Sequence, residues 1–126
     1  MAASKRKDAA KDAAAELAIF DRAHLAHYTM NIPELETEVI GLFLVQLPET
    51  LKSIGSATTQ AEWKLATHTL KGACASIGAK RLHALAVQLE ATPFEDGAQA
   101  RELRLKAAEA AAQDFREAVR PIYGQG

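Results

Sequence analysis

The sequence has little cysteine, no long apolar run and no excess of charge of one sign. A single cysteine, Cys74, among 126 residues excludes an internal disulfide framework and fits a reducing compartment. No apolar run approaches the roughly 18–20 residues that a membrane-spanning helix needs. Fifteen basic and sixteen acidic residues leave a net charge of −1. This balance gives no electrostatic footprint for binding nucleic acid or a membrane surface.

Proline and glycine are also scarce, with four and seven residues among many alanines and leucines, which favours helix over sheet. The length suits a single domain with one hydrophobic core. The first residues, "MAASKRKDAAKDAAAELAIF", are basic for only three positions and then carry three acids. A secretory signal needs an uninterrupted apolar stretch and transit peptides avoid acids, so we expect a cytoplasmic protein.

Hydrophobic spacing predicts a series of helices and no strands. A leading helix is expected over residues 8–18, and a short one over 22–28 with Asp21 as its cap. A long helix is expected to begin at the "NIPE" of residues 31–34. Its apolar stripe resumes in register after Pro48, which predicts a kink and not a break. The residues of this stripe are Leu35, Val39, Leu42, Phe43, Leu47, Leu51 and Ile54.

Three further helices are predicted in the second half of the chain. Thr59 and Glu62 form a capping box for a helix that ends at Gly78, with an inward stripe of Trp63, Ala66, Leu70, Ala73, Cys74 and Ile77. A short helix follows over 80–90. Asp96 with Gln99 is expected to open the last helix, with an inward stripe of Leu103, Ala107, Ala110, Ala111, Phe115, Ala118 and Ile122.

The predicted fold is therefore all-α. We expect an antiparallel up-and-down four-helix bundle over residues 21–124, preceded by a helical extension over residues 1–20 that brings one or two extra helices. Nothing in the helix patterns argues for a dimer, so a monomer is predicted.

One helix presents an unusual outward face. Stepping 100° per residue from the buried Leu70 places His68 about 160° away, nearly opposite the core. Small or apolar residues and one lysine surround it, where exposed helix faces normally carry long polar side chains. These residues are Ala61, Lys64, Leu65, Gly72, Ala75 and Ala79. Such a face lets another protein approach the imidazole closely, and Gly72 leaves open the space a side chain would cover.

Lys71 lies one turn from His68 and suits an anion on the ring, such as a phosphoryl group. Two unit charges about 4 Å apart in water attract by only about 1 kcal/mol. Lys71 could therefore orient a phosphate but not catalyse its transfer alone. The chain offers no obvious metal site, so the catalytic apparatus would have to come from a partner.

The segment "HTLKGACASIGAKRL", followed by "LAVQLE" at 85–90, resembles the signature of the histidine-containing phosphotransfer (HPt) domain family. The preceding "LFLVQLPETLKSI" resembles that family's second core helix, proline included. The resemblance covers about residues 20–120. Ala73 and Cys74 stand where the family often has serines.

This resemblance implies a phosphocarrier and not an enzyme. His68 would accept the phosphoryl group and exchange it with an aspartate of a response-regulator receiver domain. Lys71 would orient the phosphate, and Gly72 would permit close approach, beside docking contacts from Lys64, Leu65, Ala75 and Ala79. The chain would bind no cofactor, with Mg²⁺ on the receiver, and a histidine kinase or hybrid kinase would be a further partner.

The resemblance also implies that Glu90 contacts the other ring nitrogen of His68. A carboxylate accepting the Nδ1 proton leaves the Nε2 lone pair free to attack. The same carboxylate favours the doubly protonated ring, which cannot attack, so both effects on rate stay open.

Alternatives from other classes are weaker. A carboxylate-bridged metal bundle needs Glu-x-x-His pairs, and no glutamate here has histidine three residues later. A histidine kinase needs a nucleotide site, yet there is no glycine-rich loop of the usual kind. The alternative that stays open is a helical adaptor that binds receiver domains without phosphotransfer.

Overall fold

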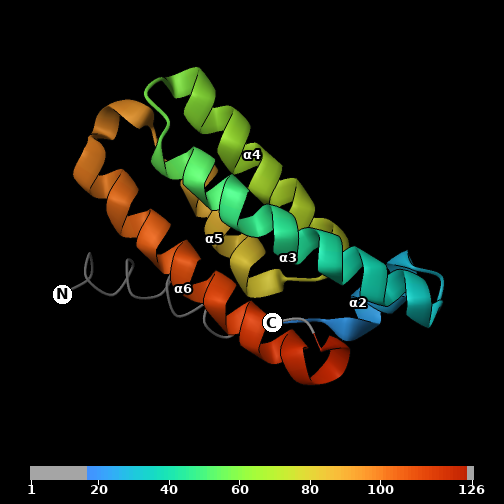
Figure 1. Cartoon of the computed structure of the whole chain (residues 1–126). Helices are drawn as coiled ribbons and strands as arrows, with labels where there is room; N and C mark the ends of the chain where they lie inside the picture. Colours follow the sequence, from blue (N-terminus) through green and yellow to red (C-terminus); the bar gives the residue numbers. More distant parts are fainter. Residues whose placement is uncertain (1–16, 125–126) are drawn as a thin grey trace.

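The computed structural model describes residues 17–124. They contain five α-helices and one 3₁₀ turn, joined by short connections (Figure 1). Within this range no strand occurs, as predicted. The elements are α2 (Arg22–Tyr28), α3 (Pro33–Gly55), α4 (Gln60–Ile77), α5 (Lys80–Ala91), η1 (Phe94–Asp96) and α6 (Ala98–Tyr123). The helix predicted over residues 8–18 lies outside the described residues, except for Leu17 and Ala18, which are not helical.

The four long helices form a ring around one core. α3 packs on α4, α4 on α5, α5 on α6, and α6 returns to α3. The diagonal pair α4 and α6 packs less closely, and Arg101 of α6 reaches α4 with its guanidinium 6.0 Å from the centroid of the Trp63 ring. Short connections join successive helices, which therefore run antiparallel, and α2 closes one end against α3 and α4 (Figure 1). The predicted four-helix bundle is confirmed, with α2 as an extra N-terminal helix.

The core follows the predicted stripes closely in α4 and α5. In α3 the stripe is confirmed at Phe43, Leu47 and Ile54, but Leu42 is 55% exposed, and Ile40 and Leu44 are buried instead. In α4, Trp63, Leu70 and Cys74 are almost completely buried. The indole Nε1 of Trp63 donates to the carbonyl oxygens of Leu89 and Thr92, each at 3.1 Å. This polar anchor fixes α4 against the end of α5, because a buried indole N–H without a partner would be costly. α3 runs unbroken through Pro48, as its resumed stripe indicated.

The register of α6 differs from the prediction. Leu103 and Ile122, expected inside, are 72% and 41% exposed. Around Phe115, which was correctly placed, the buried residues are Ala108, Ala111, Ala112 and Val119. Alanines occupy so many positions of α6 that the sequence offers little contrast between its faces.

Two of the four predicted helix caps are confirmed. Asp21 accepts from the backbone N–H of His24 at 3.1 Å, and Thr59 accepts from that of Glu62 at 3.1 Å. The other two predictions are wrong. Ile32 and not Asn31 occupies the cap of α3, because residues 30 and 31 both form a left-handed turn. Gly97 and not Asp96 precedes α6, since Asp96 belongs to the 3₁₀ turn.

Residues 17–20 pack against the bundle end that α2 closes. The Phe20 ring meets the Phe115 ring edge-on, with centroids 5.6 Å apart, and lies 6.1 Å from that of Tyr123. The backbone N–H of Arg81 donates to the Ala18 carbonyl at 3.0 Å. This part of the predicted extension is thus an extended segment that covers the core.

Candidate functional site

His68 lies on α4, and the ends of this helix fix how its faces point. Thr59 caps the first turn, and the chain leaves the helix at Gly78, whose φ of 81° is left-handed. Between these ends the buried Leu70 and Cys74 face the core. The opposite face is turned to solvent, and the His68 side chain is 67% exposed.

Glu90 is the second-to-last residue of α5, and its carboxylate contacts two side chains of α4. One carboxylate oxygen, Oε2, lies 2.8 Å from Nδ1 of His68. The other, Oε1, accepts from Nζ of Lys71 at 2.5 Å. The Glu90 and Lys71 side chains are 19% and 30% exposed. The three residues that the sequence analysis assigned to phosphate chemistry therefore meet at the Glu90 carboxylate. Lys71 is directed toward this carboxylate as well as toward the space near the ring.

This contact determines the protonation of the site. The Lys71 ammonium, and after it His68, lowers the pKa of the Glu90 carboxyl below its ordinary value. The carboxylate is therefore ionised at neutral pH and can only accept hydrogen bonds. Nδ1 of His68 must then carry the proton of the 2.8 Å contact. In the neutral ring this leaves the lone pair on Nε2, and no hydrogen bond within residues 17–124 occupies that atom.

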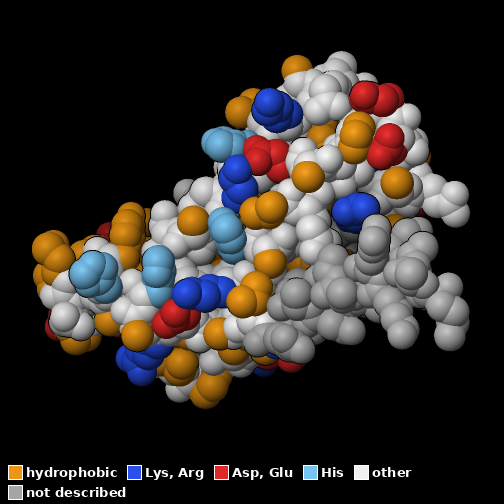
Figure 2. All heavy atoms as spheres, turned by 180° about the vertical axis from the view of Figure 1, so that it is seen from behind, with side chains coloured by type: hydrophobic (Ala, Val, Ile, Leu, Met, Phe, Trp, Pro, Cys, Tyr) orange, Lys and Arg blue, Asp and Glu red, His pale blue; other side chains and the backbone are white. Residues whose placement is uncertain are grey.

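The surroundings of His68 agree in part with the predicted docking face. Lys64, Gly72 and Ala75 are exposed, and Leu65 is 70% exposed. A Cβ added to Gly72 would meet nothing within 4 Å, so the space beside the ring is open. Figure 2 shows histidine, basic and acidic side chains next to one another on one face of the molecule, with hydrophobic side chains between them.

Ala79 does not belong to this face, and its assignment as a docking residue is wrong. It is completely buried and occupies the cap position before α5. The helical spacing that placed it beside Gly72 ends at Ile77, because Gly78 turns the chain toward α5.

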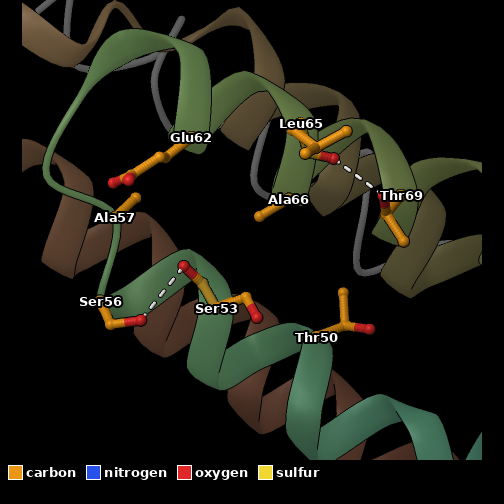
Figure 3. A pocket seen from close by; sticks show the side chains of 8 residues that line it. All are labelled: Thr50, Ser53, Ser56, Ala57, Glu62, Leu65, Ala66 and Thr69. Atoms are coloured by element: carbon orange, nitrogen blue, oxygen red, sulfur yellow. Dashed lines mark hydrogen bonds between the residues drawn. The ribbon is translucent and has the colours of Figure 1, made fainter.

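A groove that the sequence analysis did not predict lies between α3 and α4 beside this face. It has a volume of about 420 Å³. Figure 3 shows α3 on one side and α4 on the other. Its lining residues are Thr50, Ser53, Ser56, Ala57, Glu62, Leu65, Ala66 and Thr69. The three-residue spacing of hydroxyls at positions 50, 53 and 56 was the available signal, because such positions share a helix face.

Residues 17–124 bring no three histidine, cysteine, aspartate or glutamate side chains together in a way that could hold a metal ion. No helix among them is both long and apolar enough to cross a bilayer. Cys74 is buried, and burial raises the pKa of its thiol to about 12, so it is a core residue, as predicted.

The described residues thus form a four-helix bundle in which an exposed histidine shares a carboxylate with a lysine. In the comparison with protein families, the Hpt domain matches residues 38–120, which include His68, Lys71 and Glu90. The chain belongs to the Hpt domain family. Hpt domains act in phosphotransfer within two-component phosphorelays, as phosphocarriers and not as classical enzymes. No curated protein and no solved structure matches the chain.

Proposed function

We propose that His68 accepts a phosphoryl group from a phosphorylated aspartate of a receiver domain and returns it to a receiver aspartate. The single observation that carries this proposal is the exposed imidazole whose Nδ1 is held by Glu90. A ring fixed in this way offers Nε2 to a visiting protein. Its 67% exposed side chain leaves room for an in-line approach.

The chemistry proceeds as a balanced exchange. The Nε2 lone pair attacks phosphorus, an N–P bond forms, and the bond from phosphorus to the aspartyl oxygen breaks. The aspartate leaves as a carboxylate with the electron pair of that bond. The ring becomes a phosphoimidazolium because Nδ1 keeps its proton. In the reverse step an aspartate oxygen attacks phosphorus and the neutral imidazole leaves.

Glu90 supports both directions of this exchange. Its ionised carboxylate, 2.8 Å from Nδ1, stabilises the positive charge that the ring acquires when Nε2 is phosphorylated. Because the proton stays on Nδ1, the leaving group of the return step is a neutral ring and not an imidazolate. The same carboxylate also favours the doubly protonated ring, which has no lone pair to attack with.

Lys71 contributes a positive charge next to the phosphoryl group. An ammonium has three N–H donors, and Glu90 accepts one of them. The remaining donors can bind a phosphoryl oxygen without loss of the ion pair. This role is orientation, since a partly exposed charge pair supplies only about 1 kcal/mol.

The receiver supplies the rest of the catalytic apparatus in this proposal. Mg²⁺ bound to the receiver would neutralise charge on the transferring phosphoryl group. Lys64, Leu65, Gly72 and Ala75 form the docking contacts around the ring. We further propose that the chain works as a cytoplasmic monomer and receives phosphoryl groups from a histidine kinase or hybrid kinase through such receivers.

The experiment is phosphotransfer from a ³²P-labelled receiver domain to the purified chain. We expect an acid-labile, base-stable label on wild type and none on His68→Gln. The circular dichroism spectra of the two should agree, because His68 contributes nothing to the core. An unlabelled wild type that still binds the receiver would establish the adaptor function instead. A labelled His68→Gln variant would move the acceptor to another residue.

A further inference from the structure

The groove between α3 and α4 lies on the opposite side of His68 from the Lys71–Glu90 pair. Lys71 points toward α5, where it meets Glu90. Leu65 and Thr69, one turn before and one residue after His68, line the groove facing α3 (Figure 3). Because Leu65 is 70% exposed, lies one turn from His68 and lines the groove, a protein that docks over Leu65 to bring its aspartate to Nε2 also borders the groove.

Three of the four hydroxyls in the groove are oriented to accept hydrogen bonds. Thr50 donates its only hydroxyl hydrogen to the Gln46 carbonyl at 3.1 Å. Thr69 donates to the Leu65 carbonyl at 2.8 Å, and Ser56 to the Lys52 carbonyl at 2.9 Å. Because a hydroxyl has one hydrogen and two lone pairs, these three groups have only acceptor capacity left for a visiting molecule.

The groove also has a negative charge and no positive one. Of the eight lining residues only Glu62 is charged. Its Oε1 accepts from the backbone N–H and the hydroxyl of Thr58, at 2.8 and 2.9 Å. These bonds, that of the backbone first, lower the pKa of the Glu62 carboxyl, so it is ionised at neutral pH. The Oε2 atom is left for another donor.

Apolar surface completes the groove. Leu65 stands at its rim, and Ala57 and Ala66 lie half-buried and buried within it. Lysine and arginine place an aliphatic stem on apolar surface and a charged group beyond it. The combination of apolar wall, acceptor hydroxyls and one carboxylate is complementary to such a side chain.

We propose that this groove receives a lysine or arginine side chain of the docked receiver domain, and so selects among receivers. The stem passes the acceptor hydroxyls of Thr50 and Thr69 and lies against Leu65 and Ala66, and the cationic group binds the Glu62 carboxylate at the other end of the groove (Figure 3). The proposal rests on the proposed function, because the occupant belongs to a receiver that delivers its aspartate to His68. It adds a specificity determinant outside the phosphate site.

The test is titration calorimetry of the chain with the unphosphorylated receiver domain that labels His68 fastest. Glu62→Gln removes the charge and keeps a hydrogen-bond acceptor for Thr58. We expect it to raise the Kd about threefold to fivefold at low salt, the range of an exposed charge pair. Its matched control, Asp114→Asn, removes the same charge from an exposed site of α6, whereas every residue that lines the groove belongs to α3, α4 or the turn between them. The control should leave the Kd unchanged.

A second variant places a positive charge in the groove. Ser53 is exposed and lines the groove from α3, so Ser53→Lys should keep the fold and raise the Kd about tenfold or more through like-charge repulsion. Ala110→Lys, on an exposed position of α6, is the control. Replacing the receiver's surface lysines and arginines by glutamate, one at a time, should identify one change that restores binding to Ser53→Lys.

The outcomes separate this proposal from the phosphotransfer proposal. Both groove variants should still label His68 at saturating receiver concentration, with the defect confined to Kd and KM. If labelling is normal and neither groove variant changes the Kd more than its control, the groove proposal is wrong and phosphotransfer stands. A wild type that no receiver labels overturns both.

Discussion

At the scale of single residues, the central feature is that one carboxylate serves two partners. Glu90 binds the Nδ1 of His68 with one oxygen and Lys71 with the other. The position of the ring, its tautomer and the direction of the lysine therefore depend on the same side chain. Replacing Glu90 should alter all three, whereas replacing Lys71 should alter mainly the charge near the phosphoryl group.

Glu90→Gln should change the pH dependence of stability. The folded-state pKa of Glu90 lies below its ordinary value of 4.5. The ionised carboxylate therefore stabilises the fold above about pH 4.5, and this contribution is lost as the pH falls through the folded-state pKa. At pH 6, we expect urea unfolding to show wild type more stable than Glu90→Gln by no more than about 1 kcal/mol, since the pair is near the surface. By pH 3 the difference should shrink; a constant difference would contradict the ion pair.

Lys71→Ala should slow phosphotransfer without abolishing it. Loss of about 1 kcal/mol of attraction to the phosphoryl group corresponds to a rate about fivefold lower. Rapid-quench kinetics at saturating receiver concentration would measure it, with Lys106→Ala, at an exposed position of α6, as a control for general loss of positive charge. If the two variants show the same rate as wild type, Lys71 has no part in orienting the phosphate.

At the scale of helices, Gly72 within α4 and Gly78 at the C-cap of α4 have opposite structural needs. Gly72 has helical geometry and open space around it, whereas Gly78 is left-handed and lies against the chain before α2. A Cβ at position 78 would come 2.6 Å from the carbonyl oxygen of Asp21. Gly78 is thus required by the fold, while Gly72 is not.

The matched pair Gly72→Ala and Gly78→Ala tests this difference. The first should raise the free energy of unfolding by about 0.5–1 kcal/mol, because alanine restricts the unfolded chain and favours helix. The second should lower it by at least about 1 kcal/mol through the left-handed backbone and the close contact. Urea unfolding of both variants is sufficient. Equal effects of the same sign would contradict the assignment.

The buried face of a helix could be predicted wherever large apolar residues recur at helical spacing among polar ones. α4 was placed correctly because Trp63, Leu70 and Ile77 mark one face. α6 was not, because its buried face consists largely of alanines that also occur on its exposed face. The caps of α3 and α6 were misplaced because the actual turns use a left-handed pair at residues 30 and 31 and a left-handed Gly97, which composition does not reveal.

The candidate site was predictable only where it depends on one helix. Spacing along α4 gave the exposure of His68, Leu65 and Gly72. The resemblance, and not spacing, implied the contact with Glu90. The shared hydrogen bond to Lys71 and the groove against α3 depend on how neighbouring helices pair, which the sequence does not specify.

At the scale of the whole molecule, the bundle has an aromatic cluster at the end that α2 closes. Phe20 contacts Phe115 and Tyr123, and the Phe43 and Phe115 rings meet with centroids 5.2 Å apart. This cluster joins the segment before α2 to α3 and α6. The site around His68 uses none of these residues, so stability and phosphotransfer should be separable.

Phe20→Ala tests this separation. Loss of a half-buried ring with two aromatic neighbours should lower the free energy of unfolding by about 2 kcal/mol. The rate of phosphotransfer to the folded protein should stay at the wild-type value. Leu103→Ala, which truncates a 72% exposed side chain, should change stability by less than about 0.5 kcal/mol. A Phe20→Ala protein as stable as wild type would show that residues 17–20 do not support the bundle.

The most direct measurement of the central claim is to locate the phosphoryl group by ³¹P and ¹⁵N NMR after transfer from a phosphorylated receiver domain. The account predicts one phosphoryl group on Nε2 of His68, with a proton retained on Nδ1 next to Glu90. A phosphoryl group on Nδ1, on another residue, or nowhere on the chain would contradict it.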